Sequence, residues 1–360
     1  MNNPKESKTM RAAGLYGIPL DIRITEMNKP EIDSDSVILR VVNCGLCNSE
    51  VKTATRGHPL LDVKPLPLIL GHEFSGIVHE VGDNIKNVTE GDRLVIMSMV
   101  PCGYCYQCRK GKLNLCENYF SSIIDTGAFA PYVKISGPEV KKRIYPIDKS
   151  VPFEFAAMAE PIACSIRGIE QAQIRPGDTV TILGAGFMGL ILTNLAAVCG
   201  AARVIVIDQY KHRLDIAQEI GATDVINFLE ENSVETVKSL TGGKGSDVVI
   251  EATGVPKAYE DAFQIVGRGG SVVYFGGVAK GSKIDIDPVK IHYDEIRIVG
   301  SANPSPHNVD RALFMIKNKI LKVDKLITHR MHAFKLKEAM ELALTKEPIK
   351  IMTYFDESDY

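Results

Sequence analysis

Four cysteines on one short stretch give this sequence its sharpest chemical signal. They are separated by two, two and seven residues: Cys102, Cys105, Cys108 and Cys116. Four thiolates on one loop can close a tetrahedral zinc site, and because such a site has no open position its role is structural. An iron–sulfur cluster can use the same ligands, but the long last interval favours zinc. We therefore predict a zinc lobe at about 101–117.

A second set of candidate metal ligands is spread over two segments. Residues 44–50 read CGLCNSE, and residues 71–73 read GHE. A thiolate, an imidazole and a carboxylate from separate segments can hold zinc with one position left for water or substrate. Each residue taken alone also fits a buried thiol, a satisfied histidine or a surface glutamate. The pattern therefore indicates a catalytic zinc only in combination with the other motifs.

A glycine-rich segment, GAGFMG at 184–189, follows an apolar run and opens a helical stretch. In a G-x-G-x-x-G turn, Gly184 permits the tight bend, Gly186 leaves room for a pyrophosphate, and Gly189 lets the helix approach the sheet. Phe187 and Met188 are also expected to lie at the cofactor, because the helix begins at Met188 and its free N–H groups can hold phosphate. The segment predicts a dinucleotide-binding site.

An acidic residue marks the cofactor that this site prefers. Asp208 ends the next apolar run, 24 residues after Gly184. A carboxylate at this position accepts the ribose hydroxyls of the adenosine and repels a 2′-phosphate, so NAD is favoured over NADP. Lys211, His212 and Arg213 weaken this preference, because basic residues could neutralise a phosphate.

The elements that must position these residues change in kind near residue 177. Before it, β-rich runs at 36–42, 77–81 and 93–97 with Gly-Asp turns predict a barrel-like or sandwich domain. After it, apolar runs alternate with helix-length segments, which predicts a parallel, doubly wound sheet. The six predicted strands are 179–183, 203–208, 224–228, 247–251, 271–275 and 296–300. A helix is predicted at 188–199, and helices at 308–317 and 336–344 and a strand at 350–355 are predicted to follow.

The composition is that of an ordinary globular protein. The chain has 360 residues and a formal net charge of −2, which favours two domains and gives no electrostatic reason to expect nucleic-acid or membrane binding. No apolar run reaches about 18 residues, and the polar first ten residues lack a secretory signal core. We therefore expect a cytoplasmic protein. In a reducing compartment, Cys44, Cys164 and Cys199 are expected to be buried free thiols.

Together, these motifs resemble the zinc-dependent medium-chain dehydrogenases, the family that includes alcohol, polyol and threonine dehydrogenases. The resemblance covers about residues 10–355 and rests on CGLCNSE, GHEFSGIVHEVG, the four-cysteine lobe, AEPIACSI, LGAGFMG, EATG and IVGS in that order. It implies an α/β chain in which a GroES-like β-barrel catalytic domain, 1–160 and 301–360, is interrupted by a Rossmann domain, 161–300. It also implies an active site in the cleft between the domains and a homodimer or homotetramer.

The resemblance assigns the ligands of the catalytic zinc by position. Cys47, rather than Cys44, corresponds to the thiolate ligand, and His72 corresponds to the second ligand. Glu160 corresponds to the acidic third ligand of the polyol and threonine branch. Glu73 is a neighbouring carboxylate that can replace it, and the sequence does not rank the two.

The same resemblance assigns the proton path. Ser49 corresponds to the hydroxyl that accepts the substrate proton. Lys52 stands where many relatives have a relay histidine, so the path is expected to end at Lys52, at His58 or at water. Two neighbours also depart from the common pattern: Asn48 replaces a glycine, and Glu50 replaces an aspartate that lies behind the metal.

On the cofactor side, Arg213 corresponds to a residue near the adenosine. The positions on the nicotinamide side are Thr253, Gly254, Gly276, Val299 and Ser301. The resemblance thus implies two zinc ions per chain, one catalytic and one structural. It also implies NAD-dependent hydride transfer that interconverts a secondary alcohol and its ketone.

The expected substrate is a small molecule, a polyol or sugar alcohol. Lys52 and Arg56 add positive charge near the expected cleft, which raises the hypothesis of a phosphorylated substrate against that of two solvated cations. L-Threonine 3-dehydrogenase activity is the alternative, since that branch shares the acidic ligand. A non-catalytic dinucleotide-binding relative is a more distant alternative, and the retained Cys47, His72 and Glu160 argue against it.

Overall fold

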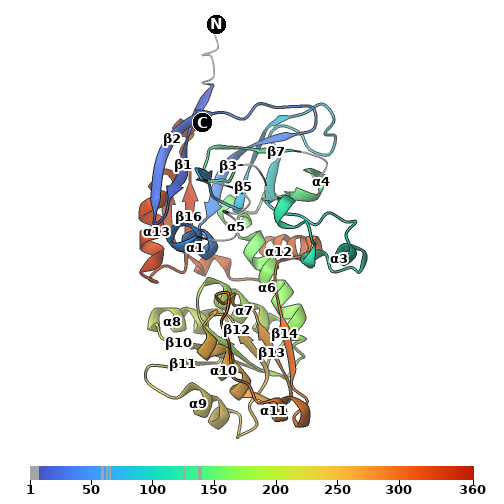
Figure 1. The fold of residues 1–360 in the computed structure, drawn as a ribbon, viewed down its shortest axis with the longest axis vertical. Coiled ribbons are helices and arrows are strands. Elements are labelled where there is room, and N and C mark those ends of the chain that lie inside the picture. The colour runs from blue at the N-terminus through green and yellow to red at the C-terminus, as the bar shows by residue number, and fades with distance from the viewer. Residues whose placement is uncertain are drawn as a thin grey trace. The chain divides into compact units, whose positions relative to one another are not determined.

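The computed structural model of the chain describes residues 8–57, 61, 64, 66–122, 124, 126–136 and 140–360. The chain forms two compact units (Figure 1). Unit 1 consists of Met1–Glu160, Ser305–Lys317 and Ile327–Tyr360, and unit 2 consists of Pro161–Pro304 and Asn318–Leu326. Unit 1 is therefore built from segments that lie far apart in the sequence.

The larger sheet of unit 1 has the order β15-β16-β3-β5-β6-β8, with β7 paired to β3. Its strands are β3 (Val37–Gly45), β5 (Glu73–Val81), β6 (Arg93–Met97), β7 (Tyr132–Ile135), β8 (Ile144–Pro146), β15 (Ile327–His332) and β16 (Lys350–Tyr354). A smaller sheet joins β2 (Asp21–Asn28), β1 (Thr9–Gly17) and β4 (Leu68–Ile69). The apolar side chains of β3, β5 and β6 form the core of this unit, including Leu39, Val41, Phe74 and Ile96.

Short helices complete unit 1. They are α1 (Asn48–Arg56), α3 (Tyr106–Arg109), α4 (Val140–Arg143), α5 (Phe153–Ala156), α12 (Pro306–Lys317) and α13 (Leu336–Leu344). The predicted helix at 308–317 begins two residues earlier, at Pro306, because proline is well tolerated at the first position of a helix. Helix α6 (Ala159–Ala172) contains the boundary between the two units.

Unit 2 is a parallel sheet in the order β11-β10-β9-β12-β13-β14 (Figure 1). Its strands are β9 (Thr179–Leu183), β10 (Arg203–Asp208), β11 (Asp224–Asn227), β12 (Ser246–Glu251), β13 (Val266–Tyr274) and β14 (Arg297–Gly300). Its further helices are α7 (Phe187–Val198), α8 (Lys211–Ile220), α9 (Ser233–Leu240), α10 (Pro256–Ile265) and α11 (Pro288–Tyr293). The strand order reverses between β9 and β12, which is where doubly wound folds bind dinucleotides. The predicted fold class is confirmed.

Several local predictions were wrong. Strand β13 begins at Val266, five residues before the predicted start, because the glycine-rich residues before Ser271 also belong to the strand, where the register with β12 shifts. Cys199 is exposed and Cys164 is only partly buried, whereas Cys44 is buried as expected. Cys199 follows the last residue of α7, where the chain leaves the helix, and its side chain is exposed there.

In the part of the chain that the structure describes, no helix combines the length and the apolar composition needed to cross a membrane.

Candidate active site

Cys47 lies where strand β3 ends and helix α1 begins. It is the residue that precedes the first turn of α1. The carboxylate of Glu50, the third helical residue, accepts a hydrogen bond from Cys47 N at 3.0 Å. This contact satisfies an N–H group at the helix start in the manner of a capping box. The hydroxyl of Ser49 donates to Cys47 Sγ at 3.2 Å, so the predicted proton acceptor lies beside the predicted ligand.

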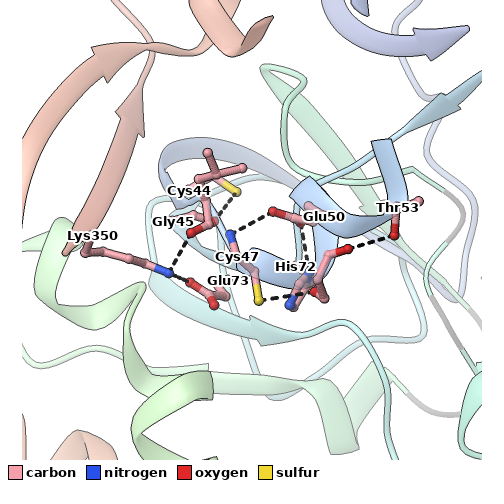
Figure 2. Close-up of polar contacts among 10 residues, drawn as sticks. Cys44, Gly45, Cys47, Glu50, Thr53, His72, Glu73 and Lys350 are labelled. Atoms are coloured by element: carbon pink, nitrogen blue, oxygen red, sulfur yellow. Dashed lines mark hydrogen bonds and ion pairs between the residues drawn. The ribbon is translucent and has the colours of Figure 1, made fainter. Parts of the chain in front are cut away.

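The other carboxylate oxygen of Glu50 fixes the ring of His72. Glu50 Oε1 is 2.8 Å from His72 Nδ1, and the Glu50 side chain is buried (Figure 2). A histidine ligand commonly gives one ring nitrogen to a carboxylate and the other to the metal, so this contact leaves Nε2 for a metal. Burial alone would lower the pKa of His72, but the charges of Glu50 and Cys47 raise that pKa well above its usual value.

Glu73 takes part in a buried ion pair that the sequence did not predict. Glu73 begins β5 and is paired in register with Gly45 of β3. Lys350, the first residue of β16, forms an ion pair with Glu73 Oε2 and donates to Leu46 O at 3.0 Å (Figure 2). Both charged side chains are 2% exposed. Burial lowers the pKa of Lys350, but the neighbouring charge of Glu73 outweighs burial and leaves that pKa above its usual value.

Gly45 makes this pair sterically possible. A Cβ at this position would lie 2.6 Å from Glu73 Oε2 and 2.8 Å from Lys350 Cε. Both distances are shorter than real Cβ contacts, so any larger residue would displace the carboxylate or the ammonium group.

Cys47, His72 and Glu73 each offer one ligand atom within 4.8 Å of the other two. A thiolate, an imidazole and a carboxylate are the donor set that zinc accepts, so these residues fit the metal that the sequence predicts. Glu160 is not part of this group: it is the second residue of α6 and is partly buried. The structure thus brings Glu73, rather than Glu160, to the two other candidate ligands.

The remaining residues predicted near this site are placed as follows. Cys44 is 1% exposed on β3, and burial together with the charges of Glu50 and Glu73 raises the pKa of its thiol well above the usual value. Lys52 is partly buried on α1, and Arg56, which ends this helix, is exposed. His58 lies outside the described residues.

The four clustered cysteines converge as predicted for a closed metal site. Their sulfur atoms all lie within 4.8 Å of one another. The pairs Cys102–Cys108 and Cys105–Cys116 each have an Sγ–Sγ distance of 4.0 Å. A tetrahedron with Zn–S bonds of about 2.3 Å has edges of about 3.8 Å, so the arrangement fits a zinc ion with four thiolate ligands.

Backbone N–H groups of this loop donate hydrogen bonds to the cysteine sulfur atoms, which stabilises the thiolate form. Cys116 Sγ accepts hydrogen bonds from the backbone N–H groups of Cys102 and Asn118, both at 3.3 Å. Burial opposes ionisation of Cys102, but backbone N–H groups outweigh it and lower the pKa of this thiol to about 6. Burial raises the pKa of Cys108 to about 12, so a bound cation is needed to hold all four sulfurs as thiolates.

The predicted dinucleotide turn follows β9 in unit 2. Gly184 has φ +99°, a conformation that favours glycine. A Cβ at Gly189 would lie 1.7 Å from Gly184 O, so this glycine lets α7 approach the turn. A Cβ at Gly186 would meet only Arg213 Nη1, at 3.9 Å, which leaves the space beside this glycine open for a pyrophosphate. Helix α7 begins at Phe187, one residue before the predicted start, and Met188 is its second residue.

Asp208 is more heavily engaged than the sequence indicates. Its Oδ2 accepts from Ala185 N at 2.7 Å, and its Oδ1 accepts from Gln209 N and Tyr210 N at 2.7 and 2.9 Å. The carboxylate therefore ties the end of β10 to the glycine-rich turn. Arg213 lies 4.8 Å from the centre of the Tyr210 ring, and burial lowers the pKa of its guanidinium.

The residues predicted on the nicotinamide side follow three neighbouring strands. Thr253 and Gly254 follow β12, Gly276 follows β13, and Val299 and Ser301 lie at the end of β14. The carboxyl ends of parallel strands lie on one edge of a sheet, and the register pairs β12 with β13 and β13 with β14. The sequence missed Glu251, whose buried carboxylate accepts hydrogen bonds from the turn at Thr253 and Gly254.

A third cluster of possible metal ligands lies near the C-terminus: His332, Asp356 and Asp359. Here His332 Nε2 contacts Asp359 Oδ2 at 2.8 Å, and His332 Nδ1 accepts from Phe334 N at 3.1 Å. Both ring nitrogens are therefore used by the protein, and the cluster fixes the C-terminal turn rather than offering a second open metal site.

Fold and site define a two-unit oxidoreductase with a candidate zinc centre and a dinucleotide-binding sheet. The model of the alcohol dehydrogenase GroES-like domain matches residues 33–146, and that of the zinc-binding dehydrogenases matches residues 188–318. The chain is 31% identical over 354 residues to a sorbitol dehydrogenase of Bacillus subtilis, covering 96% of this chain and 98% of that protein. The chain belongs to the zinc-dependent medium-chain dehydrogenase family, as the sequence predicted, and is a zinc-binding alcohol dehydrogenase with a nicotinamide cofactor.

One further relative and one solved structure are similar to nearly the whole chain. The chain is 28% identical over 351 residues to a D-arabitol-phosphate dehydrogenase of Enterococcus avium, covering 96% of this chain and 97% of the relative. A crystal structure from Sinorhizobium meliloti 1021, described as a zinc-binding dehydrogenase and bound to NADP, superposes with a TM-score of 0.88. It is 28% identical and covers 97% of this chain and 100% of its own.

Proposed function

We propose that this enzyme oxidises a secondary hydroxyl of a polyol or sugar alcohol to the ketone, with a catalytic zinc held by Cys47, His72 and Glu73. The observation that carries this proposal is the convergence of these three side chains within 4.8 Å. The orientation of His72 by Glu50 supports it. Zinc bound there would act as a Lewis acid and make the alkoxide of the substrate accessible near neutral pH.

The protein groups around this site support proton removal by Ser49. Its hydroxyl lies 3.2 Å from Cys47 Sγ, and its backbone carbonyl accepts from Thr53 Oγ1 at 2.8 Å. These contacts hold Ser49 in the first turn of α1, beside Cys47, one of the proposed ligands of the zinc. The path beyond it is proposed to end at Lys52 or at water, with His58 as the remaining candidate.

We propose a second, structural zinc at Cys102, Cys105, Cys108 and Cys116, so that each chain carries two zinc ions. Unit 1 is proposed as the catalytic domain and unit 2 as the dinucleotide domain, near the boundaries that the sequence predicts. The assembly is proposed to be a homodimer or homotetramer in the cytoplasm.

NAD is proposed as the preferred cofactor because of Asp208. The Asp208 carboxylate, at the end of β10, would repel a 2′-phosphate. Arg213 opposes this preference because its guanidinium lies beside Gly186, and the NADP-bound relative shows that the fold accommodates the phosphorylated cofactor. Steady-state kinetics with both cofactors test the preference, and equal kcat/KM values for NAD and NADP would contradict it.

A phosphorylated substrate is the second candidate within this function. Lys52 and Arg56 lie one turn apart on α1 and carry positive charge, and a relative is named for a phosphorylated polyol. This candidate is tested by comparing kcat/KM for a free polyol with kcat/KM for its phosphate ester. If Lys52 and Arg56 bind the phosphate, the phosphate ester is expected to have the higher value. Equal efficiency on both would remove the phosphate hypothesis.

The proposal is tested by following NADH formation with sorbitol, xylitol, L-threonine, butanediol and sugar phosphates. A polyol or its phosphate is expected to give the highest kcat/KM, and L-threonine as the best substrate would establish the alternative activity. If the zinc-loaded enzyme reduces NAD with none of these alcohols, the proposed polyol dehydrogenase activity is contradicted. A non-catalytic dinucleotide-binding protein would then be favoured.

A further inference from the structure

Glu251 is a buried carboxylate to which the proposed reaction assigns no role. It is the last residue of β12 and is 0% exposed. Its Oε1 accepts hydrogen bonds from Thr253 N at 2.7 Å and from Gly254 N at 3.0 Å, and the hydroxyl of Thr253 also donates to it. Three donors on one oxygen make a strong, charge-assisted cap for the turn that follows the strand.

The same carboxylate lies against the loop that follows β13. A Cβ at Gly276 would lie 2.8 Å from Glu251 Oε2 and 2.3 Å from Gly254 N. Gly254 has φ +72°, and a Cβ there would lie 2.4 Å from Gly277 O. The two loops therefore touch backbone to backbone, and the Glu251 carboxylate lies next to their contact.

The loop that follows β13, which contains Gly276, is also held by helix α10. The Tyr259 hydroxyl of α10 donates to Gly276 O. The Tyr259 ring stacks on that of Tyr274, with centroids 4.1 Å apart and planes 12° from parallel. The position of Gly276 is thus constrained by the Glu251 carboxylate and by the hydroxyl of Tyr259.

Thr253 connects this arrangement to the glycine-rich turn. A Cβ at Gly184 would lie 2.8 Å from Thr253 Cγ2, so the methyl group of Thr253 packs directly on the first glycine of the turn. Thr253 is exposed, whereas the acid that fixes it is buried. A buried carboxylate is costly unless it is well hydrogen-bonded. An exposed aspartate or serine could cap the same turn without the cost of burying a charge, so capping alone does not explain a buried glutamate here.

We propose that Glu251 is a positioning residue for the nicotinamide half of the cofactor site. It fixes Thr253 and Gly254 against Gly184 and Gly276, and so shapes the surface that receives the nicotinamide. The inference rests on the proposed dinucleotide function and goes beyond it, because it assigns a role to a residue that cannot touch solvent.

The test compares two ligands that differ at the nicotinamide end. NADH carries the nicotinamide riboside, and ADP-ribose lacks the nicotinamide ring. We expect Glu251→Met, which removes the acceptor at similar length, to raise the Kd of NADH about tenfold, the effect of leaving buried donors unsatisfied. The Kd of ADP-ribose is expected to change less than about threefold. Calorimetry measures both values on the full-length enzyme.

Three variants accompany this experiment. Glu251→Gln keeps one acceptor oxygen and is expected to bind NADH within about threefold of wild type. Glu251→Asp withdraws the carboxylate by one methylene and is expected to weaken NADH selectively, which keeps the test decisive if Glu251→Met does not fold. The control is Thr181→Val, which removes the buried hydrogen bond of 2.7 Å between Thr181 and Ser246 in the same sheet. It is expected to lower Tm with no selective effect on NADH.

A loss of affinity that is equal for NADH and ADP-ribose in both the Met and Asp variants would overturn the inference, since it would reveal a general structural role. Unchanged affinity for NADH in these variants, or a loss with Glu251→Gln as large as with Glu251→Met, would overturn it as well. A wild-type enzyme that binds neither ligand would overturn the proposed function together with the inference, which separates the two failures.

Discussion

At the level of single residues, Glu50 links the helix start to the metal ligands. One oxygen accepts from Cys47 N at 3.0 Å and the other contacts His72 Nδ1 at 2.8 Å. An aspartate is shorter by one methylene, so the glutamate at this position is long enough to serve both neighbours. This explains how the chain departs from the common family pattern and still orients the two candidate ligands.

The two candidate acidic ligands can be separated by metal affinity. Because Glu73 lies within 4.8 Å of the Cys47 and His72 ligand atoms, Glu73→Gln is expected to weaken zinc at this site by at least about tenfold. Glu160→Gln serves as the matched control and is expected to have a smaller effect. Competition with a chelator measures both affinities, and a larger loss in the Glu160 variant would contradict the assignment of Glu73.

The buried pair of Lys350 and Glu73 carries a prediction about stability. Lys350→Met leaves the Glu73 carboxylate buried without its cation, which is expected to lower the free energy of unfolding by about 3 kcal/mol. In the double variant with Glu73→Gln no buried charge is left uncompensated, so most of this loss is expected to be recovered. Urea unfolding of the metal-free protein measures both changes, and a double variant less stable than Lys350→Met would show that the pair is not the cause.

At the level of elements, two glycines of the glycine-rich turn have different expected roles. Gly189 is needed for packing of the helix, and Gly186 is needed for cofactor binding. A Cβ at Gly189 would lie 1.7 Å from Gly184 O, whereas a Cβ at Gly186 meets only Arg213, at 3.9 Å. Gly189→Ala is therefore expected to lower Tm, because α7 must move away from the turn. Gly186→Ala is expected to keep the wild-type Tm and to raise the KM for NAD by at least about tenfold, because its methyl group occupies the pyrophosphate position. A Gly186 variant with normal KM would contradict this placement.

The four-cysteine lobe depends on its metal more than on a core. Its buried cluster consists of Cys105, Cys108, Cys116 and Tyr119, which is too small to hold the segment without zinc. Cys105→Ser is expected to lose one zinc and to become sensitive to limited proteolysis within 102–116. Unit 2 should stay resistant in the same digest. Proteolysis at the wild-type rate would contradict a structural role for the metal.

The sequence predicted unit 2 better than unit 1 for a physical reason. Continuous runs of β-branched residues at 179–183 and 203–208 are buried on both faces, and both match β9 and β10 in full. Strands β1 and β2 were missed. In β2 the exposed and partly buried residues do not alternate regularly, and the only apolar residues are Ile22, Ile24 and Met27.

The same contrast holds for the site. The sequence placed Cys47, His72 and Glu73 because each stands in a short local motif. Lys350 was missed because its partner is 277 residues away in the chain, and only the pairing of β16 with β3 brings it close. Glu251 belongs to the EATG motif but was given no role, because the sequence does not show that the turn after β12 buries its carboxylate.

At the level of the whole molecule, the near-zero net charge gives no overall attraction for an anionic substrate. A net charge of −2 over 360 residues gives no strong field to steer an anionic substrate. If the substrate is phosphorylated, as proposed above, we expect individual cations such as Lys52 and Arg56 to bind the phosphate.

The most direct test of the account is the zinc content of the wild-type enzyme and of Cys47→Ala, measured by mass spectrometry together with NADH formation on the best polyol. We expect two zinc ions per wild-type chain. The variant is expected to keep one zinc and the wild-type secondary structure, and to lose at least about a thousandfold in kcat/KM, because Lewis-acid stabilisation contributes several kcal/mol. A Cys47→Ala enzyme that keeps both zinc ions, or that oxidises the polyol at the wild-type rate, would contradict it.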